Sequence, residues 1–141
     1  MGCRIPGLVA GLVLLLGTTA PAGAQEGAIE QARTAARVWL ALLDGHEYYE
    51  SWDAAGGLLK GAVSQEEWTV RWSSTLGPLG AVSSRTAKSS EYSTKLPGAP
   101  DGEYVILNFD TAFVNKQTVV ETVVLRKEPD GLWRVSGYRI L

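Results

Sequence analysis

The sequence predicts an α+β fold in which N-terminal helices pack on one face of a four-stranded, curved antiparallel sheet. In the first half of the chain, apolar residues recur at three- and four-residue steps, the spacing of amphipathic helices. In the second half, segments rich in Val, Ile, Thr and Phe alternate with short turns, which is typical of strands joined by hairpins. Helices followed by hairpin-linked strands form one α+β domain.

The N-terminal segment has the layout of a cleavable secretory signal peptide. Arg4 supplies a positive start, residues 8–16 are apolar, and small side chains precede a cleavage point between Ala24 and Gln25. We therefore expect an exported protein that is periplasmic or secreted after cleavage. The chain divides into a signal peptide over residues 1–24 and a single domain over residues 25–141.

Composition and charge exclude several classes of function. The formal net charge is −2 and no basic stripe occurs, which argues against a nucleic-acid partner. Cys3 is the only cysteine and precedes the cleavage point, so the mature chain has no disulfide and no thiolate zinc site. The only histidine, His46, stands in a polar turn, and we expect neither a metal nor a cofactor. No mature segment approaches the length of about 20 apolar residues that a transmembrane helix needs.

Four helical segments are expected. The first covers residues 28–43, and two shorter ones cover 48–55 and 58–63. The fourth begins at Ser64, whose hydroxyl can accept from the backbone N–H of Glu67 while the Glu67 carboxylate reaches back, as in a capping box. A Gly-Pro pair after Leu76 ends this last helix.

Four strands follow, and the first is polar. A Pro/Gly loop precedes the second strand, and Asn115-Lys116 and Glu128-Pro129-Asp130-Gly131 form the turns between the remaining three. The expected strands cover residues 82–95, 103–114, 117–127 and 132–140.

The turn at Asn115-Lys116 fixes a register, because a two-residue loop places Thr111 opposite Val120. In this register one face is almost wholly apolar, and we expect the helices to cover it. That face carries Val105, Leu107, Phe109, Thr111, Phe113, Val120, Thr122, Val124, Trp133, Val135 and Gly137.

The opposite, mixed face places Asp110, Glu121 and Tyr138 in one row across three strands. Two opposed carboxylates repel each other, which raises one pKa or recruits a cation. One interpretation is a general acid–base pair with a tyrosine donor. The alternative is that Lys88 or Arg85 neutralises the row, or that water screens its charges.

The same mixed face suggests self-association. Its apolar side chains would form a patch that monomers seldom leave exposed, so a homodimer through the sheet face is one possibility. The patch consists of Ile106, Val119, Val123, Leu125 and Ile140.

Five tryptophans allow two interpretations: an aromatic-lined pocket for a small apolar ligand, or ordinary core packing. The candidate ligand-binding residues are Trp39, Trp52, Trp68, Trp72, Arg85 and Arg134.

Several blocks of the second half resemble the domain of unknown function 4019 family of bacterial exported proteins. The blocks are Val82-Ser83-Ser84-Arg85-Thr86, residues 96–104, Phe109-Asp110-Thr111-Ala112-Phe113, Glu121-Thr122-Val123 and residues 131–138. The resemblance runs from about Trp39 to the C-terminus and implies a small exported α+β domain, with no established activity. The layout is also similar to the NTF2-like and cystatin-like cones, an analogy of fold that does not fix function.

The function expected from these features is a non-catalytic exported module that binds an unknown protein or a small apolar ligand. One alternative is an isomerase- or dehydratase-like enzyme with Asp110 as general base, assisted by Glu121 and Tyr138. The other is a structural envelope protein or a sheet-face homodimer.

Overall fold

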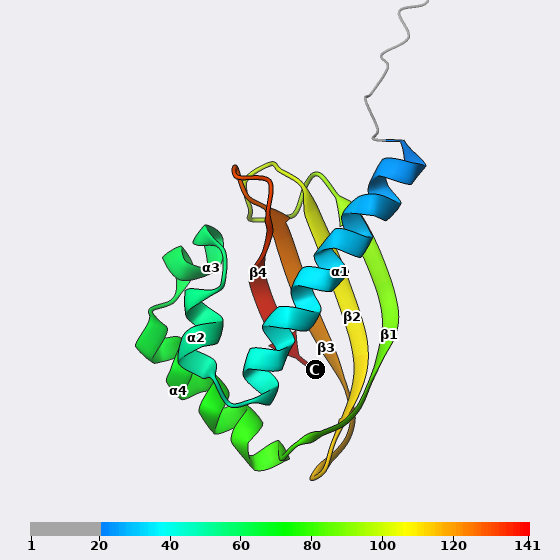
Figure 1. Cartoon of the computed structure of the whole chain (residues 1–141). Coiled ribbons are helices and arrows are strands. Elements are labelled where there is room, and N and C mark those ends of the chain that lie inside the picture. Colours follow the sequence, from blue (N-terminus) through cyan, green and yellow to red (C-terminus); the bar gives the residue numbers. More distant parts are fainter. Residues whose placement is uncertain (1–20) are drawn as a thin grey trace, which may run out of the picture.

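The computed structural model describes residues 21–141, so the positive start and the apolar run of the predicted signal peptide lie outside the described residues. These described residues form four α-helices, a short 3-10 turn and four strands (Figure 1). Their bounds are α1 Ala22–Asp44, α2 Tyr48–Asp53, α3 Gly57–Ala62, α4 Gln65–Leu76, η1 Gly77–Leu79, β1 Val82–Ser93, β2 Tyr104–Phe113, β3 Lys116–Lys127 and β4 Trp133–Ile140.

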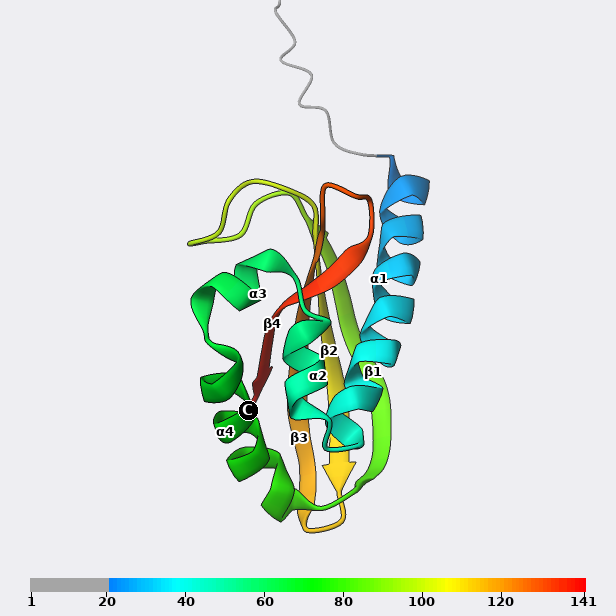
Figure 2. The ribbon, with the colours of Figure 1, turned by 60° about the vertical axis from the view of Figure 1, so that its left-hand side comes forward.

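The four strands form one antiparallel sheet in the order β1-β2-β3-β4, and the predicted α+β class is confirmed. Helix α1 crosses one face of the sheet, while α2, α3 and α4 gather beside β4 (Figures 1 and 2). We call the helix-covered face the inner face and the opposite one the outer face.

The periodicity predicts a helix that begins at residue 28, whereas α1 begins at Ala22. The first turn of α1 therefore includes the expected cleavage point. Its buried residues recur at three- and four-residue steps and face the sheet, as the sequence predicts. They are Ala32, Ala36, Trp39, Leu40 and Leu43.

Helix α4 begins with the predicted capping box. The backbone N–H of Glu67 donates to the Ser64 hydroxyl at 3.2 Å, and the Ser64 N–H donates to the Glu67 carboxylate at 3.4 Å. The indoles of Trp68 and Trp72 are buried on the face that follows from this start.

The turn between β2 and β3 differs from the prediction. Its two loop residues are Val114 and Asn115, and their backbone N–H groups donate to the carbonyls of Ala81 and Leu79. This anchoring to the segment after α4, with an irregularity near Ala112, places Thr111 opposite Val119 rather than Val120. The predicted register is therefore wrong by one residue, and a slip of one exchanges the two faces of β3.

The exchange of faces removes the predicted apolar patch. Val119, Val123 and Leu125 are buried on the inner face, and Ile140 packs against the core. Only Ile106 of the five predicted patch residues stays on the outer face, where it is half-buried. The sheet-face homodimer thus loses the surface on which its prediction was based.

A β-bulge at Ser136 reverses which side chains of the second half of β4 face the helices. Leu125 pairs with Val135, whereas Val124 pairs with Gly137, so one extra residue stands in β4. Trp133 and Val135 are buried as predicted. Beyond the bulge, Tyr138 turns to the inner face, although the predicted register places it on the outer one.

Candidate functional site

A buried polar centre lies on the inner face, around the carboxylate of Glu121. This residue is 1% exposed, and its carboxylate accepts from Arg85 Nε at 2.8 Å. The hydroxyls of Thr111 and Tyr138 also donate to it. Glu121 lies on β3, and β1, β2 and β4 each supply one of these partners. Their hydrogen bonds offset the free-energy cost of burying the carboxylate charge.

Arg85 joins this centre to the end of α1. Its guanidinium donates two hydrogen bonds to the carboxylate of Asp44, at 2.8 and 2.9 Å. Burial acts to lower the pKa of Arg85, but the hydrogen bonds to Asp44 and Glu121 outweigh it, and the pKa is raised. The pairing also compensates a carboxylate at the C-terminal end of α1, where the helix dipole disfavours negative charge.

Tyr138 is a hydrogen-bond donor in this centre. Burial, and then the negative charge of Glu121, raise the pKa of its phenol. The rings of Trp39 and Trp72 pack edge-on against the phenol, with centroids 5.4 and 4.7 Å away. A cavity of only about 10 Å³ borders Tyr138, room for about one water molecule. The centre therefore ties α1 to the sheet and leaves little space for a substrate.

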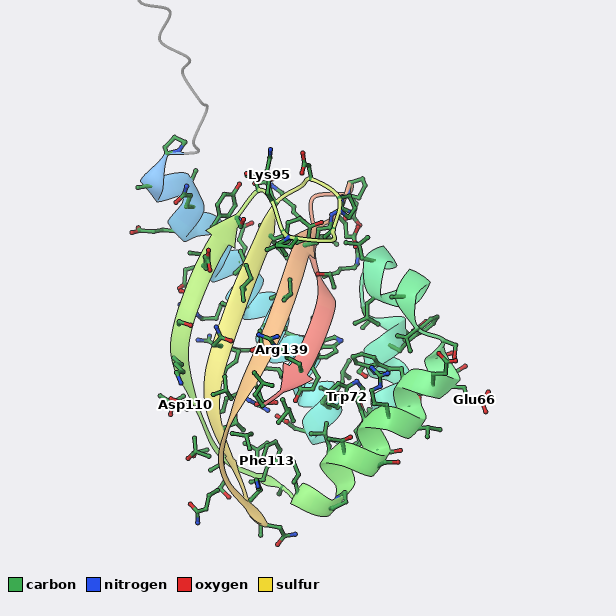
Figure 3. The ribbon with its side chains drawn as sticks, turned by 180° about the vertical axis from the view of Figure 1, so that it is seen from behind. Glu66, Trp72, Lys95, Asp110, Phe113 and Arg139 are labelled. Atoms are coloured by element: carbon green, nitrogen blue, oxygen red, sulfur yellow. The ribbon has the colours of Figure 1, made fainter. Side chains whose placement is uncertain are left out.

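Asp110 does not belong to this centre. Its side chain is on the outer face, 43% exposed and 3.6 Å from Lys88 Nζ. Figure 3 shows the outer side of the sheet, with Asp110 on it. Trp72, on α4, lies away from Asp110 in this view. The predicted row of Asp110, Glu121 and Tyr138 is therefore wrong, because the register slip and the β4 bulge carry the last two to the inner face.

The contact between Glu121 and Tyr138 is nevertheless present, although both residues lie on the face opposite to the predicted one. The predicted neutralisation occurs in two places. Lys88 approaches Asp110 on the outer face, and Arg85 binds Glu121 on the inner face.

Three of the candidate tryptophans belong to the packing of the helices. The indole of Trp68 donates to the Ser51 hydroxyl at 2.9 Å, and that of Trp52 donates to the Val63 carbonyl at 2.8 Å. Trp72 is buried against Trp68 and Tyr138, and its Nε1 has no hydrogen-bond partner among the described residues. These three tryptophans therefore fit the interpretation of ordinary packing and not that of a ligand pocket.

An apolar groove of about 560 Å³ lies between α1 and β4, with the β3–β4 turn at its edge. Trp39, Trp133 and Val135 are buried residues of its lining, while Val38 and Leu132 are 69% and 58% exposed. The lining residues are Gln31, Thr34, Ala35, Val38, Trp39, Leu42, Ala54, Leu125, Gly131, Leu132, Trp133, Arg134 and Val135. Of the six predicted ligand-binding residues, this groove brings together Trp39 and Arg134.

Two polar pairs border the groove. The indole N–H of Trp133 donates to Gln31 Oε1 at 3.2 Å. The guanidinium of Arg134 binds both oxygens of Asp130, at 3.0 and 2.7 Å. These hydrogen bonds lower the pKa of Asp130 and raise that of Arg134. The charge of Arg134 is thus compensated at the rim.

Sequence reasoning missed Gln31, Val38 and Leu132. The sequence does carry a signal for the side of the groove that α1 forms. Ala35, Val38 and Leu42 recur at three- and four-residue steps beside the main apolar stripe of this helix. Leu132 follows a turn, and only the folded chain brings it into the same groove as Val38.

Within residues 21–141, no three His, Cys, Asp or Glu side chains come close enough to hold a metal ion. His46 is exposed, with Nδ1 2.8 Å from the Tyr48 hydroxyl. Of the helices in this described part, none combines the length and the apolar character needed to cross a membrane.

Comparison with known proteins gives a family and no activity. The sequence model of the DUF4019 family, described as a protein of unknown function, matches residues 35–138. No curated protein and no solved structure matches the chain.

Proposed function

Since the chain belongs to the DUF4019 family of proteins of unknown function, we propose a function from its geometry. The protein is an exported, non-catalytic module that binds a small apolar molecule in the groove between α1 and β4. Export rests on the signal peptide predicted over residues 1–24. Ligand binding rests on a single observation, the apolar groove that Val38 and Leu132 leave open to solvent.

The size and shape of the groove favour a small molecule over a protein. Its volume of about 560 Å³ lies within the range of roughly 300–1,000 Å³ that is common for small-molecule sites. Such sites are lined mainly by apolar and aromatic side chains with a few polar groups, which describes this lining. A ligand that covers Val38 and Leu132 gains about 25 cal/mol for each Å² of apolar surface removed from water.

The buried polar centre is the weaker candidate for function. Glu121 already has three hydrogen-bond donors, and the cavity beside Tyr138 holds about one water molecule. A general base must reach the proton of a bound substrate, and this carboxylate is enclosed by its partners. We therefore assign the centre a structural role.

A binding experiment with a neutral apolar fluorophore tests the proposal. Purified protein is titrated with N-phenylnaphthylamine, whose emission rises in apolar surroundings, and the variants Val38→Asp and Leu132→Asp are compared with the parent. We expect both changes to weaken binding at least about tenfold, because each places a charge in the apolar site.

The matched control is Val70→Asp, because Val70 is 60% exposed on α4, away from the groove. This variant should bind the probe like the parent. Thermal unfolding of each variant checks that the fold is intact. Absence of binding by the parent, or equal binding by the Val38→Asp and Val70→Asp variants, would contradict the proposal and leave a structural role in the envelope as the better account.

A further inference from the structure

We infer that the groove selects an uncharged ligand that carries one hydrogen-bonding group, and that the side-chain amide of Gln31 recognises this group. The inference rests on the proposed function, because it concerns the same groove. It specifies the chemical class of the ligand: an apolar body with a single neutral polar group, such as an alcohol, a ketone or an ester.

The charge of the lining supports a neutral ligand. Among the described residues that line the groove, Arg134 alone has an ionisable side chain, and both oxygens of Asp130 bind its guanidinium. A carboxylate or phosphate ligand would have to compete with Asp130 for this partner. An anionic head group therefore finds no uncompensated cation among the lining residues to offset its lost hydration.

The orientation of the Gln31 amide is fixed by its neighbour. An indole N–H can only donate, so the atom of Gln31 that meets Trp133 Nε1 is the carbonyl oxygen. The amide nitrogen, Nε2, is then left with two donor hydrogens, and it makes no hydrogen bond with the described residues. Gln31 thus offers a donor to an acceptor group at its end of the groove.

The remaining lining provides for the apolar body of the ligand. Trp39, Leu125 and Val135 are nearly inaccessible to solvent, and Val38 and Leu132 are the exposed large apolar residues of the lining. A ligand that places its polar group at Gln31 therefore lies with the rest of its surface against mainly apolar side chains, with Thr34 and Arg134 as the other polar lining residues. This arrangement matches the common design of small-molecule sites, in which a few polar groups fix orientation.

Three ligands of equal chain length test the charge selectivity: decanol, decanoate and decylamine, each titrated by calorimetry at neutral pH. We expect decanol to bind at least about tenfold more tightly than either ion. Equal or tighter binding of decanoate or decylamine would overturn the inference while leaving the groove a ligand site. No binding by any of the three would refute the proposed function itself.

A second experiment isolates the amide. Gln31→Glu keeps an acceptor for Trp133 but removes the Nε2 donor. A decyl-length methyl ketone, which can only accept, should lose about fivefold in affinity for this variant. The secondary alcohol obtained by reducing that ketone can donate to the new carboxylate and should keep its affinity.

The matched control is Gln117→Glu, which makes the same change on an exposed residue at the start of β3, outside the groove lining. This variant should bind ketone and alcohol like the parent. Gln31→Glu should also bind decylamine more tightly than the parent, because the new carboxylate pairs with the ammonium group. Equal losses for ketone and alcohol, or none for either, would overturn the role of Gln31.

Discussion

Arg85 Nε and Glu121 Oε1 lie 2.8 Å apart beneath the helices, in a position where neither side chain has free access to solvent. The pair spans the sheet from β1 to β3, and Arg85 continues it to Asp44 at the end of α1. A charge buried in this way is tolerated only while its partner is present. The pair therefore makes the position of α1 on the sheet dependent on a few polar contacts.

Replacing Arg85 by Met should destabilise the domain by about 3–5 kcal/mol, because it leaves the Glu121 carboxylate buried without its cation. Urea unfolding followed by tryptophan fluorescence measures the change. The control is Lys88→Met, which removes a partly exposed ion pair with Asp110 and should cost at most about 1 kcal/mol. Similar losses in the two variants would contradict the structural role of Arg85.

Removing both charges should be less harmful than removing one. In the double variant Arg85→Met with Glu121→Gln, the amide oxygen accepts from one of the two hydroxyls that bind the separate Glu121 oxygens, and the amide NH2 can donate to the other hydroxyl oxygen. No unpaired charge is then buried. We expect the double variant to be more stable than Arg85→Met alone, with an interaction free energy of about 1–3 kcal/mol. Strictly additive losses would show that the two residues do not act as a pair.

The raised pKa of Tyr138 predicts a loss of stability at alkaline pH. In the unfolded chain a tyrosine releases its proton near pH 10, whereas in the folded protein Tyr138 keeps it to higher pH. The folded state then binds more protons, so its stability is fully present below about pH 10 and falls as the pH rises further. Urea midpoints between roughly pH 8 and 11 measure this slope.

The contribution of Tyr138 can be separated from that of other tyrosines. The pKa values of Tyr48 and Tyr92 are also raised, mainly by burial, and they contribute to the same slope. Tyr138→Phe should make the slope less steep, whereas the exposed Tyr49→Phe should leave it unchanged. An unchanged slope in Tyr138→Phe would mean that the phenol is not held protonated by its surroundings.

The capping box of α4 offers a test of local stability. Ser64→Ala removes the acceptor for the Glu67 N–H and should cost about 1 kcal/mol of unfolding free energy. Ser73→Ala, on an exposed position within the same helix, is the control and should be within about 0.5 kcal/mol of the parent. Equal effects would indicate that the start of α4 is set by tertiary packing instead of its cap.

Local chemistry accounts for the elements that the sequence predicted well. The capping box marks the start of α4, and Gly131, with its positive φ of 83°, ends the β3–β4 turn next to Pro and Asp. The inner face of β2 also follows from simple alternation, because its apolar residues are buried as predicted. These features need information from only a few neighbouring residues.

The register could not be predicted in this way, because distant contacts determine it. The β2–β3 turn is shifted by backbone hydrogen bonds from Val114 and Asn115 to the segment before β1, and β4 is shifted by the bulge at Ser136. Each shift is one residue, which is enough to carry Glu121 and Tyr138 from one face to the other. The error therefore affected the candidate site far more than the fold.

The candidate groove was only partly predictable for a related reason. The sequence predicts either a pocket or a core for all the tryptophans alike, because an indole is large and amphipathic, and it does not tell which buried indole borders a groove. The groove is lined by residues of α1, the β3–β4 turn and β4, which the fold brings together. Val38 and Leu132 are ordinary apolar residues, far apart in the sequence, that only the fold brings into one groove.

The last prediction concerns the N-terminus. The expected cleavage point between Ala24 and Gln25 lies in the first turn of α1, whereas the buried residues of that helix begin at Ala32. Removal of residues 1–24 therefore shortens an exposed turn and leaves the core intact. Protein expressed from the full sequence in a bacterium and recovered from the periplasm should begin at Gln25 by intact mass, and its stability should equal that of the cytoplasmic, uncleaved form within about 1 kcal/mol. Recovery of only the uncleaved chain, retained in the cytoplasm, would contradict the proposed export.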